Sequence, residues 1–428
     1  MNQKTSFISA AVLSALVLPV ALSGCATKES TVKLTPAVVK VNPAAVKVTQ
    51  PVLPDTGQSV QYDIDGNKMA ASESSLYTGQ DASIQGNALR YQDNGDGTVT
   101  DLNTGLTWQQ AHDFTRRNLQ DSTDYVKSMT LAGHSDWRVP TIKELYSIAD
   151  FDGQLIKPGD QGVSKPYIDT DYFEYQYDER LAFAGQFWSS TVYVKNDVQN
   201  FTKHGGIQGG FGFNFSDGHI KSYETGLFFD GTTIQKSDGM FVPGCFVRAV
   251  RGTTALYNME YVDNSDDTVT DKSTALMWAK NDSGTKMDWV EALEYAEKSQ
   301  LAGHNDWRLP NSKELQSLVD YDKTTFPAIN TDYFNTTLTS FESPEDAYYF
   351  WSSTTQGDFK WTADYVSFAQ AWSKKNSDAT EFFDWHGAGA QRSDPKAGNP
   401  SDFEQASEMA SDYISIDNWV RLVRDVTP

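Results

Sequence analysis

The segment Gly-His-Ser-Asp-Trp-Arg-Val-Pro at residues 133–140 returns as Gly-His-Asn-Asp-Trp-Arg-Leu-Pro at residues 303–310. Two further motifs recur around it in the same order: Thr-Val-Thr-Asp at 98–101 and 268–271, and Phe-Trp-Ser-Ser-Thr at 187–191 and 350–354. The chain therefore contains two copies of one sequence unit. Two copies predict a pair of tandem domains rather than a solenoid, which needs at least three repeats.

The repeats also set the expected domain boundaries. The two copies run from about residue 89 to 252 and from 257 to 428, and each closes on a Val-Arg pair. A chain of 428 residues exceeds what one hydrophobic core usually serves, so two domains of ordinary size agree with its length.

Each copy has the pattern of a mixed helix and strand domain. A strand and turn span residues 90–108 and again 260–278, and Asn94-Gly95 supplies the positive φ that a tight hairpin needs. A helix follows each hairpin, and a second helix begins after the Trp-Arg-x-Pro segment with a capping pair such as Thr141 and Glu144. We expect an α+β fold with short antiparallel sheets, two helices and long loops in each copy.

The spacing of apolar residues predicts which faces of these helices are buried. In the second copy the first helix places Trp289 and Leu293 on one face, and we expect the helix to end at Gly303. The second helices are expected to bury one set of residues in each copy: Leu145, Ile148 and Ala149, and Leu315, Leu318 and Val319.

The N-terminus has the pattern of a cleaved export signal. Lys4 precedes an apolar run from Phe7 to Leu22 that is short for a bilayer span and ends in small residues. The segment Leu-Ser-Gly-Cys at 22–25 resembles the lipobox of bacterial lipoproteins, in which the cysteine carries a diacylglycerol. The resemblance implies removal of residues 1–24 and a membrane anchor on Cys25. The alternative is an ordinary secretory signal with an incidental cysteine.

Residues 25–58 are predicted to be a tether, followed by a leader segment at 59–88. Prolines alternate in the tether with Val, Thr, Ala and Lys, a composition typical of an extended linker. Ala26 rather than Asp follows the cysteine, which in lipoproteins of this type implies sorting to the outer membrane. We expect a lipid-anchored protein of the cell outer membrane, either periplasmic or surface-exposed.

Composition excludes two classes of protein. The formal net charge of −22 repels polyanions at long range, so we expect no nucleic-acid partner. The mean hydropathy of −0.51 argues against a polytopic membrane protein. Cys25 and Cys245 are the two cysteines, so a lipidated Cys25 leaves Cys245 without a disulfide partner, and we expect Cys245 to be buried.

Several motifs in a fixed order resemble one known family. They are Asp-Asn-Gly-Asp-Gly-Thr-Val-Thr-Asp at 93–101, Gly-His-x-Asp-Trp-Arg-x-Pro with the Glu-Leu helix behind it, Phe-Trp-Ser-Ser and the closing Val-Arg pair. Both copies look like the Lcl C-terminal domain family, which is similar to C-type-lectin-like folds. The resemblance implies a surface protein, since the founding member is an adhesin that binds sulfated polysaccharides. This chain differs from that adhesin in its lipid anchor, its acidity and its lack of a collagen-like stalk.

The acidic turn at 93–101 does not match a calcium loop. If Gly97 takes the sixth position of an EF-hand loop, Gln92 falls at the first position, where a carboxylate is needed. We therefore expect a hairpin turn with solvated carboxylates and no bound metal.

The repeated histidines have two interpretations. His134 with Asp136, and their counterparts His304 and Asp306, could form an acid–base or metal pair, or could close the turn after the first helix. The arginine of the same motif, Arg138 in the first copy and Arg308 in the second, is expected to pair with internal carboxylates or carbonyls.

The sequence contains no familiar catalytic motif. Gly-x-Ser-x-Gly, His-Glu-x-x-His, Cys-x-x-Cys and a phosphate-binding loop do not occur. Some oxidases with a lectin-like fold use paired cysteines, which a lone Cys245 does not supply. We expect a protein without catalytic residues and without a cofactor.

Aromatic residues concentrate in the second copy and suggest a ligand surface. The candidate ligand-binding residues are Trp351, Trp361, Tyr365, Trp372, Trp385 and His386. Aromatic rings with planar polar groups nearby, here Asp384 and Arg392, are what a glycan site needs. The alternative is that most of these rings belong to the core. The counterpart in the first copy, residues 203–215, is a glycine-rich loop, so the two copies need not bind the same ligand.

These observations favour an outer-membrane-anchored, non-enzymatic recognition or adhesion protein that binds a glycan or an extracellular matrix ligand. The alternatives are an envelope structural or assembly protein that binds another protein, and a hydrolase without a known motif.

Overall fold

The computed structural model describes most of the two copies and the segment before them. The described residues are 48, 50–70, 77–156, 162–175, 185–193, 209–225, 228–229, 233–235, 241–338, 340–374, 380–403 and 412–426. Both copies belong to one compact unit, residues 42–428. The expected signal peptide, Cys25 and most of the expected tether lie outside the described residues and stay predictions.

Each copy has a four-stranded antiparallel sheet built from its first three strands and its last. In the first copy the strand order is β1 (Tyr91–Asp93), β2 (Thr98–Asp101), β3 (Thr107–Gln109) and β10 (Val250–Arg251). In the second copy it is β11 (Tyr261–Asp263), β12 (Thr268–Asp271), β13 (Leu276–Ala279) and β19 (Val423–Asp425). The expected hairpin is confirmed, and Gly95 and Gly97 in its turn have φ of 71° and 85°. In the second copy Ser265 and Asp267 hold positive φ at the same two positions.

The helices agree with the sequence prediction, with two differences. The described helices are α1 (Leu119–Ser128), α2 (Ile142–Ser147), α4 (Trp289–Glu297), α5 (Ser312–Ser317) and the short α6 (Pro400–Phe403), which is a third helix in the second copy where two were expected. Capping boxes start α2 and α5, as expected. However, α4 ends at Glu297 rather than near Gly303, because residues 301–303 form a separate 3-10 turn in which Ala302 and Gly303 both have positive φ.

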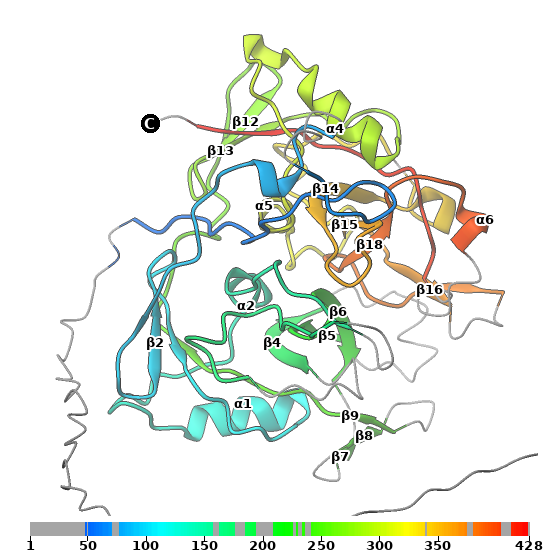
Figure 1. Cartoon of the computed structure of the whole chain (residues 1–428). Helices are drawn as coiled ribbons and strands as arrows, with labels where there is room; N and C mark the ends of the chain where they lie inside the picture. The colour runs from blue at the N-terminus through cyan, green and yellow to red at the C-terminus, as the bar shows by residue number, and fades with distance from the viewer. Residues whose placement is uncertain are drawn as a thin grey trace, which may run out of the picture. The chain divides into compact units, whose positions relative to one another are not determined.

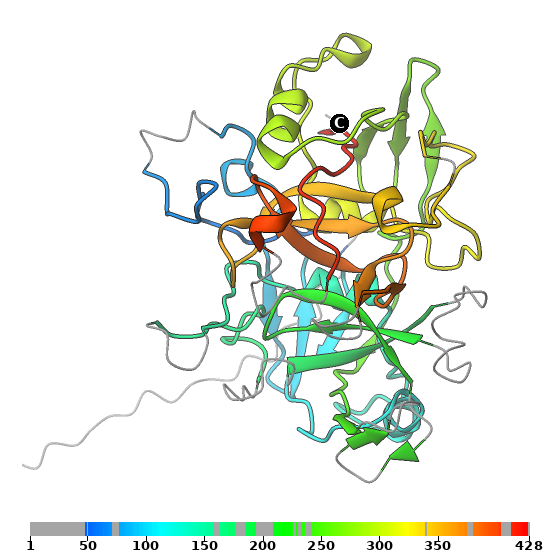
Figure 2. The same ribbon diagram turned by 90° about the vertical axis from the view of Figure 1, so that its right-hand side faces the viewer.

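Three strands from each copy join in one six-stranded antiparallel sheet (Figures 1 and 2). Its order is β14 (Tyr349–Thr355), β15 (Thr362–Ser367), β18 (Gln391–Pro395), β6 (His219–Glu224), β5 (Gly209–Asn214) and β4 (Gln186–Val192). The copies meet where Gln391 of β18 pairs with Ile220 of β6, two residues at corresponding positions in their copies. The tandem copies are therefore fused through a common sheet.

Part of the expected glycine-rich loop of the first copy is β5, a strand with all six residues buried. Glycine is required there by close approach, because a Cβ on Gly212 would lie 2.5 Å from the carbonyl oxygen of Phe187. Two small sheets complete the fold: β7 (Phe228–Phe229), β8 (Thr233–Gln235) and β9 (Phe241–Pro243), and the ribbon of β16 (Trp372–Lys374) and β17 (Phe382–Asp384).

The largest apolar cluster draws on both copies. It contains Trp108 and Phe213 from the first copy and Trp278 and Phe350 from the second, all essentially inaccessible to solvent. The residues predicted to be buried on α2, α4 and α5 are confirmed, as is the burial of Cys245. Burying apolar surface contributes about 25 cal/mol per Å², so a core shared in this way stabilises both copies together.

The segment before the first copy packs against both copies. We name residues 50–70 and 77–88 the strap, and it is the blue segment in Figure 1. Its residues 50–58 were expected to be extended tether, yet Leu53 and Thr56 are buried. The strap bonds to the first copy through Phe151 N, which donates to Thr56 O at 2.8 Å, and to the second through Lys313 Nζ, which donates to Asp55 O at 2.8 Å.

Candidate functional site

Two of the candidate ligand-binding residues belong to the core. Trp351 on β14 is 0% exposed and Tyr365 on β15 is 2% exposed. The Trp351 ring nitrogen donates to Met287 O at 3.0 Å, and the Tyr365 ring stacks on Tyr349 with 4.2 Å between centroids. Rings enclosed in this way have no free face for a ligand, so for these two residues the core interpretation holds.

Trp361 and Trp372 lie in separate clusters. Trp361 precedes β15, is half-buried and stacks on Phe403 of α6 at 5.1 Å. Trp372 opens β16, is 9% exposed and packs in the core of the second copy. The two tryptophans therefore do not form a single aromatic platform.

Three aromatic side chains that reach solvent lie together, on β17 or directly after it. Phe382, Phe383 and Trp385 are half-exposed. Lys374 Nζ lies 4.8 Å from the Phe382 ring centroid, and Tyr413 meets that ring edge-to-face at 5.4 Å. We call residues 372–374 and 382–385 the aromatic ribbon.

Asp384 joins the aromatic ribbon to both copies. Its Oδ1 accepts hydrogen bonds from the backbone N–H groups of Ala371 and Gly387, each at 3.0 Å. Its Oδ2 accepts a hydrogen bond from the hydroxyl of Tyr193, in the first copy, at 2.7 Å. A buried carboxylate with these partners orients the ribbon relative to the shared sheet.

His386 follows the ribbon and forms a polar triad with two other side chains. Its Nε2 lies 3.3 Å from Asp412 Oδ1, and Arg392 of β18 donates to Asp412 Oδ2 from Nε at 3.1 Å and also from Nη2. Burial raises the pKa of Asp412, but Arg392 and His386 outweigh burial and hold it well below its usual range. Burial, with Arg392, lowers the pKa of His386 to about 4, so the imidazole is neutral at pH 7.

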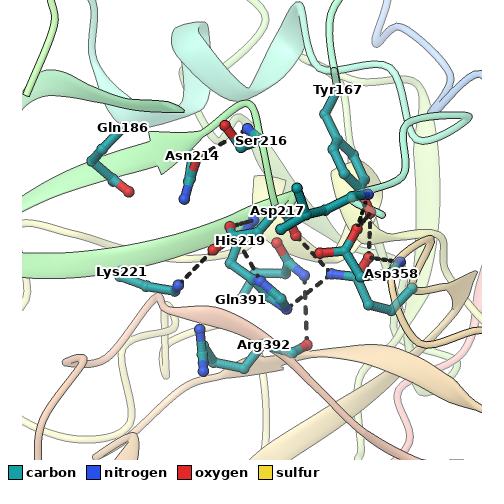
Figure 3. A network of polar contacts seen from close by, with 12 residues as sticks. Tyr167, Gln186, Asn214, Ser216, Asp217, His219, Lys221, Asp358, Gln391 and Arg392 are labelled. Atoms are coloured by element: carbon teal, nitrogen blue, oxygen red, sulfur yellow. Dashed lines mark hydrogen bonds and ion pairs between the residues drawn. The ribbon is translucent and has the colours of Figure 1, made fainter. Parts of the chain in front are cut away.

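A second polar group lies where β6 meets β18 (Figure 3). Asp217 accepts a hydrogen bond from Lys221 Nζ at 2.9 Å and lies 3.3 Å from His219 Nδ1. Gln356, from the second copy, joins His219 Nε2 at 2.9 Å and donates to the carbonyl oxygen of Asp217 at 3.0 Å. Burial, with Arg392, lowers the pKa of His219 to about 4.

This second group continues to Tyr167 and Asp358. The Tyr167 hydroxyl donates to Gln356 Oε1 at 2.5 Å and lies 2.9 Å from Asp358 Oδ1. Burial raises the pKa of Asp358 well above its ordinary value, and the charge of Asp217 adds to this. We name the residues of both polar groups the seam network: Tyr167, Asp217, His219, Lys221, Gln356, Asp358, His386, Arg392 and Asp412.

The seam network is held together by ion pairs and hydrogen bonds. Its ion pairs place two cations, Lys221 and Arg392, against the two carboxylates of Asp217 and Asp412. Among the described residues no serine hydroxyl or cysteine thiol hydrogen-bonds to either imidazole. Arg392 Nη1 and His386 Nδ1 are buried without a partner in the described part of the chain.

Sequence reasoning selected His386, with Arg392 as a polar group nearby, and missed the rest of the seam network. The network residues come from loops and strands far apart in the chain and do not recur as a motif. One signal was present: Lys221 and Arg392 occupy corresponding positions, each one residue after the pair Ile220 and Gln391 that joins the copies.

The repeated arginines have structural roles, as expected. Arg138 pairs with both carboxylate oxygens of Glu144 at 2.7 and 2.6 Å, and Arg308 pairs in the same way with Glu314. The repeated histidines are in turns. His134 exchanges two backbone hydrogen bonds with Leu131, while the neighbouring Asp136 bonds to Arg251. These contacts favour the turn interpretation over an acid–base pair.

A groove of about 420 Å³ separates the strap from the second copy. Its apolar lining includes Ile84, Leu293 and Trp307, and Glu297 and Asp306 add carboxylates. The sequence did not predict this groove because one of its walls is the strap.

Two searches of the described residues were negative. No helix in the described ranges has the length and apolar character to cross a bilayer. Within the same ranges, His, Cys, Asp and Glu form no cluster of three suited to a metal ion.

Comparison with known proteins gives one match. The family model described as the Lcl C-terminal domain matches residues 97–229 and 267–386, which covers more than half of the chain and falls once in each copy. No curated protein and no solved structure matches. Likeness to C-type-lectin-like folds therefore stays a prediction.

Proposed function

The chain belongs to the Lcl C-terminal domain family, and on this premise we propose that it is a non-enzymatic recognition protein of the cell envelope. Its ligand is a glycan or a glycan-bearing matrix component, bound by the second copy. Cys25 anchors the protein to the outer membrane, so that residues 89–428 are held outside the cytoplasm.

The observation that carries this proposal is the position of the aromatic ribbon next to the His386–Arg392–Asp412 triad. His386 directly follows Trp385, the last residue of the ribbon, and Phe382, Phe383 and Trp385 are half-exposed. Aromatic faces pack against the apolar faces of sugar rings, while planar charged groups hydrogen-bond to hydroxyls. Arg392 Nη1 and His386 Nδ1 have no hydrogen-bond partner among the residues that the structure describes, and a ligand or water that reached them would supply one.

The first copy does not offer the same surface in its described part. Phe211 and Phe213, which stand in its counterpart segment, are 0% exposed and face the core. The two copies therefore have different roles: the second binds ligand, and the first supports it through the shared sheet.

A glycan array and a panel of matrix proteins test the proposal with the chain from residue 26 onward. We expect binding that Trp385→Ala and Phe382→Ala each weaken about tenfold or more, because a central aromatic residue of an interface contributes about 2 kcal/mol. Tyr295→Ala is the matched control, since Tyr295 is 40% exposed on α4, and this variant keeps full affinity. Absence of binding to every glycan and matrix protein contradicts the proposal.

A second candidate function is supported by the groove between the strap and the second copy. Its apolar lining and carboxylates suit a protein partner with a basic side chain, as expected of an envelope assembly protein. Cross-linking in intact envelopes distinguishes the two functions: one stoichiometric protein partner linked near Glu297, with no glycan bound, favours assembly.

A further inference from the structure

The shared sheet has two edges, β4 in the first copy and β14 in the second, which occupy corresponding positions. Both strands are bulged at the same place, between Trp188 and Val192 and between Trp351 and Thr355. The copies thus provide an internal comparison of two equivalent edges.

The supporting contacts of the two edges are the same. Ser190 N donates to Pro140 O at 2.7 Å, as Ser353 N donates to Pro310 O at 2.8 Å. The first backbone N–H of α2 donates to the Thr191 hydroxyl, and that of α5 donates to the Thr354 hydroxyl, each at 3.0 Å.

The end of β14 is covered by the strap. The side-chain amide of Gln58 makes both hydrogen bonds that a neighbouring strand would make to Thr355: Nε2 donates to Thr355 O at 2.7 Å, and Oε1 accepts from Thr355 N at 3.0 Å. Next to it the Thr354 hydroxyl donates to Asp81 Oδ2 at 2.6 Å. As a result, the last three residues of β14 are all buried.

The end of β4 has no such cover in the part of the chain that the structure describes. Ser190 is exposed, and Thr191 and Val192 are half-exposed. Tyr193 N donates to Gly209 O at 2.8 Å while Val192 is opposite Gly210, so the N–H and C=O of Val192 point away from β5. Within the described residues, the end of β4 is therefore an open strand edge, where the backbone N–H and C=O of Val192 have no partner at the position that corresponds to Thr355.

We propose that the end of β4, residues 190–192, binds an extended peptide segment of a partner protein. An amide of that segment, from its main chain or from a Gln or Asn side chain, pairs with the N–H and C=O of Val192. An unpaired strand edge recruits extended peptides in this way. The strap shows that the fold accepts such a segment, since Gln58 occupies the corresponding place on β14. The strap of the same chain is committed to β14, and the occupant that we assign to β4 is a segment of a different chain.

A peptide of residues 52–66, which contains Gln58, is the probe. Its binding to the chain from residue 26 onward is measured by fluorescence anisotropy. We expect saturable binding that falls about tenfold for the probe with Gln58→Ala, because the lost hydrogen bonds contribute about 1 to 1.5 kcal/mol.

Two variants of the protein locate the binding. Val192→Pro removes the outward N–H without removing a bond to β5 and is expected to abolish binding. Val192→Thr introduces the residue found in β14, keeps the N–H, and is expected to bind the probe as the unmodified chain does. Equal binding by Val192→Pro and Val192→Thr overturns the proposal.

Hydrogen exchange covers the case in which Val192→Pro fails to fold. In the unmodified chain the Val192 amide is expected to exchange at least several-fold more slowly when the probe is saturating. Unchanged exchange, or protection at Thr355 alone, overturns the proposal. Protection of Val192 by self-association without the probe also overturns it, because the edge then belongs to a second copy of this chain. The glycan array result is independent of all of these outcomes.

Discussion

Lys143 of α2 donates a hydrogen bond to the carbonyl oxygen of Ser317 in the other copy, with 2.7 Å between the two atoms. The contact is reciprocal, since the counterpart Lys313 donates to the carbonyl oxygen of Ser147 at 2.9 Å. Burial lowers the pKa of each lysine to about 8. The copies therefore meet through the same surface on both sides, as the subunits of a symmetric dimer do.

Separating the copies should expose that surface. A fragment of residues 257–428 loses the strap and leaves β18 without β6 beside it. It also exposes the second copy's part of the common core. We expect the fragment to aggregate or to dimerise, as size-exclusion chromatography with light scattering will show. A monomer with one cooperative thermal transition contradicts this expectation and indicates independent domains.

The paired Arg–Glu contacts offer a matched comparison between the copies. Arg308 is 11% exposed in its side chain, whereas Arg138 is 37% exposed, although both bind their glutamate through two hydrogen bonds. Glu314→Gln should cost about 2 to 4 kcal/mol of unfolding free energy in denaturant titration, because it removes the buried carboxylate that pairs with Arg308 and leaves only the exposed Asp425 as its ionic partner. Glu144→Gln should cost clearly less, since solvent screens Arg138. If the two variants lose the same unfolding free energy, burial of the arginine does not determine the strength of the pair.

The two seam histidines predict a loss of stability in acid. Their pKa values in the folded chain are about 4, below the ordinary value of 6.5. The unfolded chain therefore binds more protons in this interval, and stability falls as pH decreases from 6.5 to 4, by about 3 kcal/mol for each histidine. The double variant His219→Gln and His386→Gln should show a smaller decrease than the unmodified chain when urea unfolding is measured at pH 7 and 4.5.

Asp81 in the strap predicts the opposite dependence of stability on pH, over nearly the same pH interval. Burial, with the charge of Asp55, raises its pKa to about 7. The folded chain then binds more protons than the unfolded chain between pH 4 and 7, so this residue's contribution to stability is lost as pH rises, by about 4 kcal/mol. Asp81→Asn should remove that dependence, and the difference in unfolding free energy between the variant and the parent chain measures it. A difference that stays constant with pH contradicts the assignment.

Substitution of Cys25 tests the proposed membrane anchor. Cys25→Ser should move the protein from the membrane fraction to the soluble fraction of the envelope, because the proposed lipid anchor is attached through that sulfur. Fractionation followed by immunoblotting measures the change. A variant that stays with the membrane contradicts lipidation as the anchor.

Local features of the fold could be predicted from the sequence, whereas the pairing of β6 with β18 that joins the two copies could not. The start of α2 depends on Thr141 and Glu144, three residues apart, and the burial of Trp289 on α4 follows from helical spacing. The common sheet depends on one pairing, Ile220 with Gln391, which no local pattern signals. We expected a loop at the glycines of β5. These residues form a strand, and the close approach of β4 that requires glycine there is not visible in the sequence.

The residues of the candidate site, too, could be predicted only in part. Composition selected Trp385 and His386 because aromatic and planar polar side chains concentrate in that part of the second copy. It also selected Trp351 and Tyr365, since core and surface aromatics look alike without knowledge of burial. The partner of His386 is Asp412, and the two are brought together by the folding of the second copy.

The strap determines how mechanical load enters the molecule. Among the described residues, a force applied at the N-terminus first reaches the hydrogen bonds of Val52 and Asp55, which join the strap to Asn103 in one copy and to Lys313 in the other. Tension is then divided between the two halves, and it must break several hydrogen bonds at once before either half is pulled away from its partner. In the adhesive role proposed above, the load between the membrane anchor and a bound ligand passes through the strap.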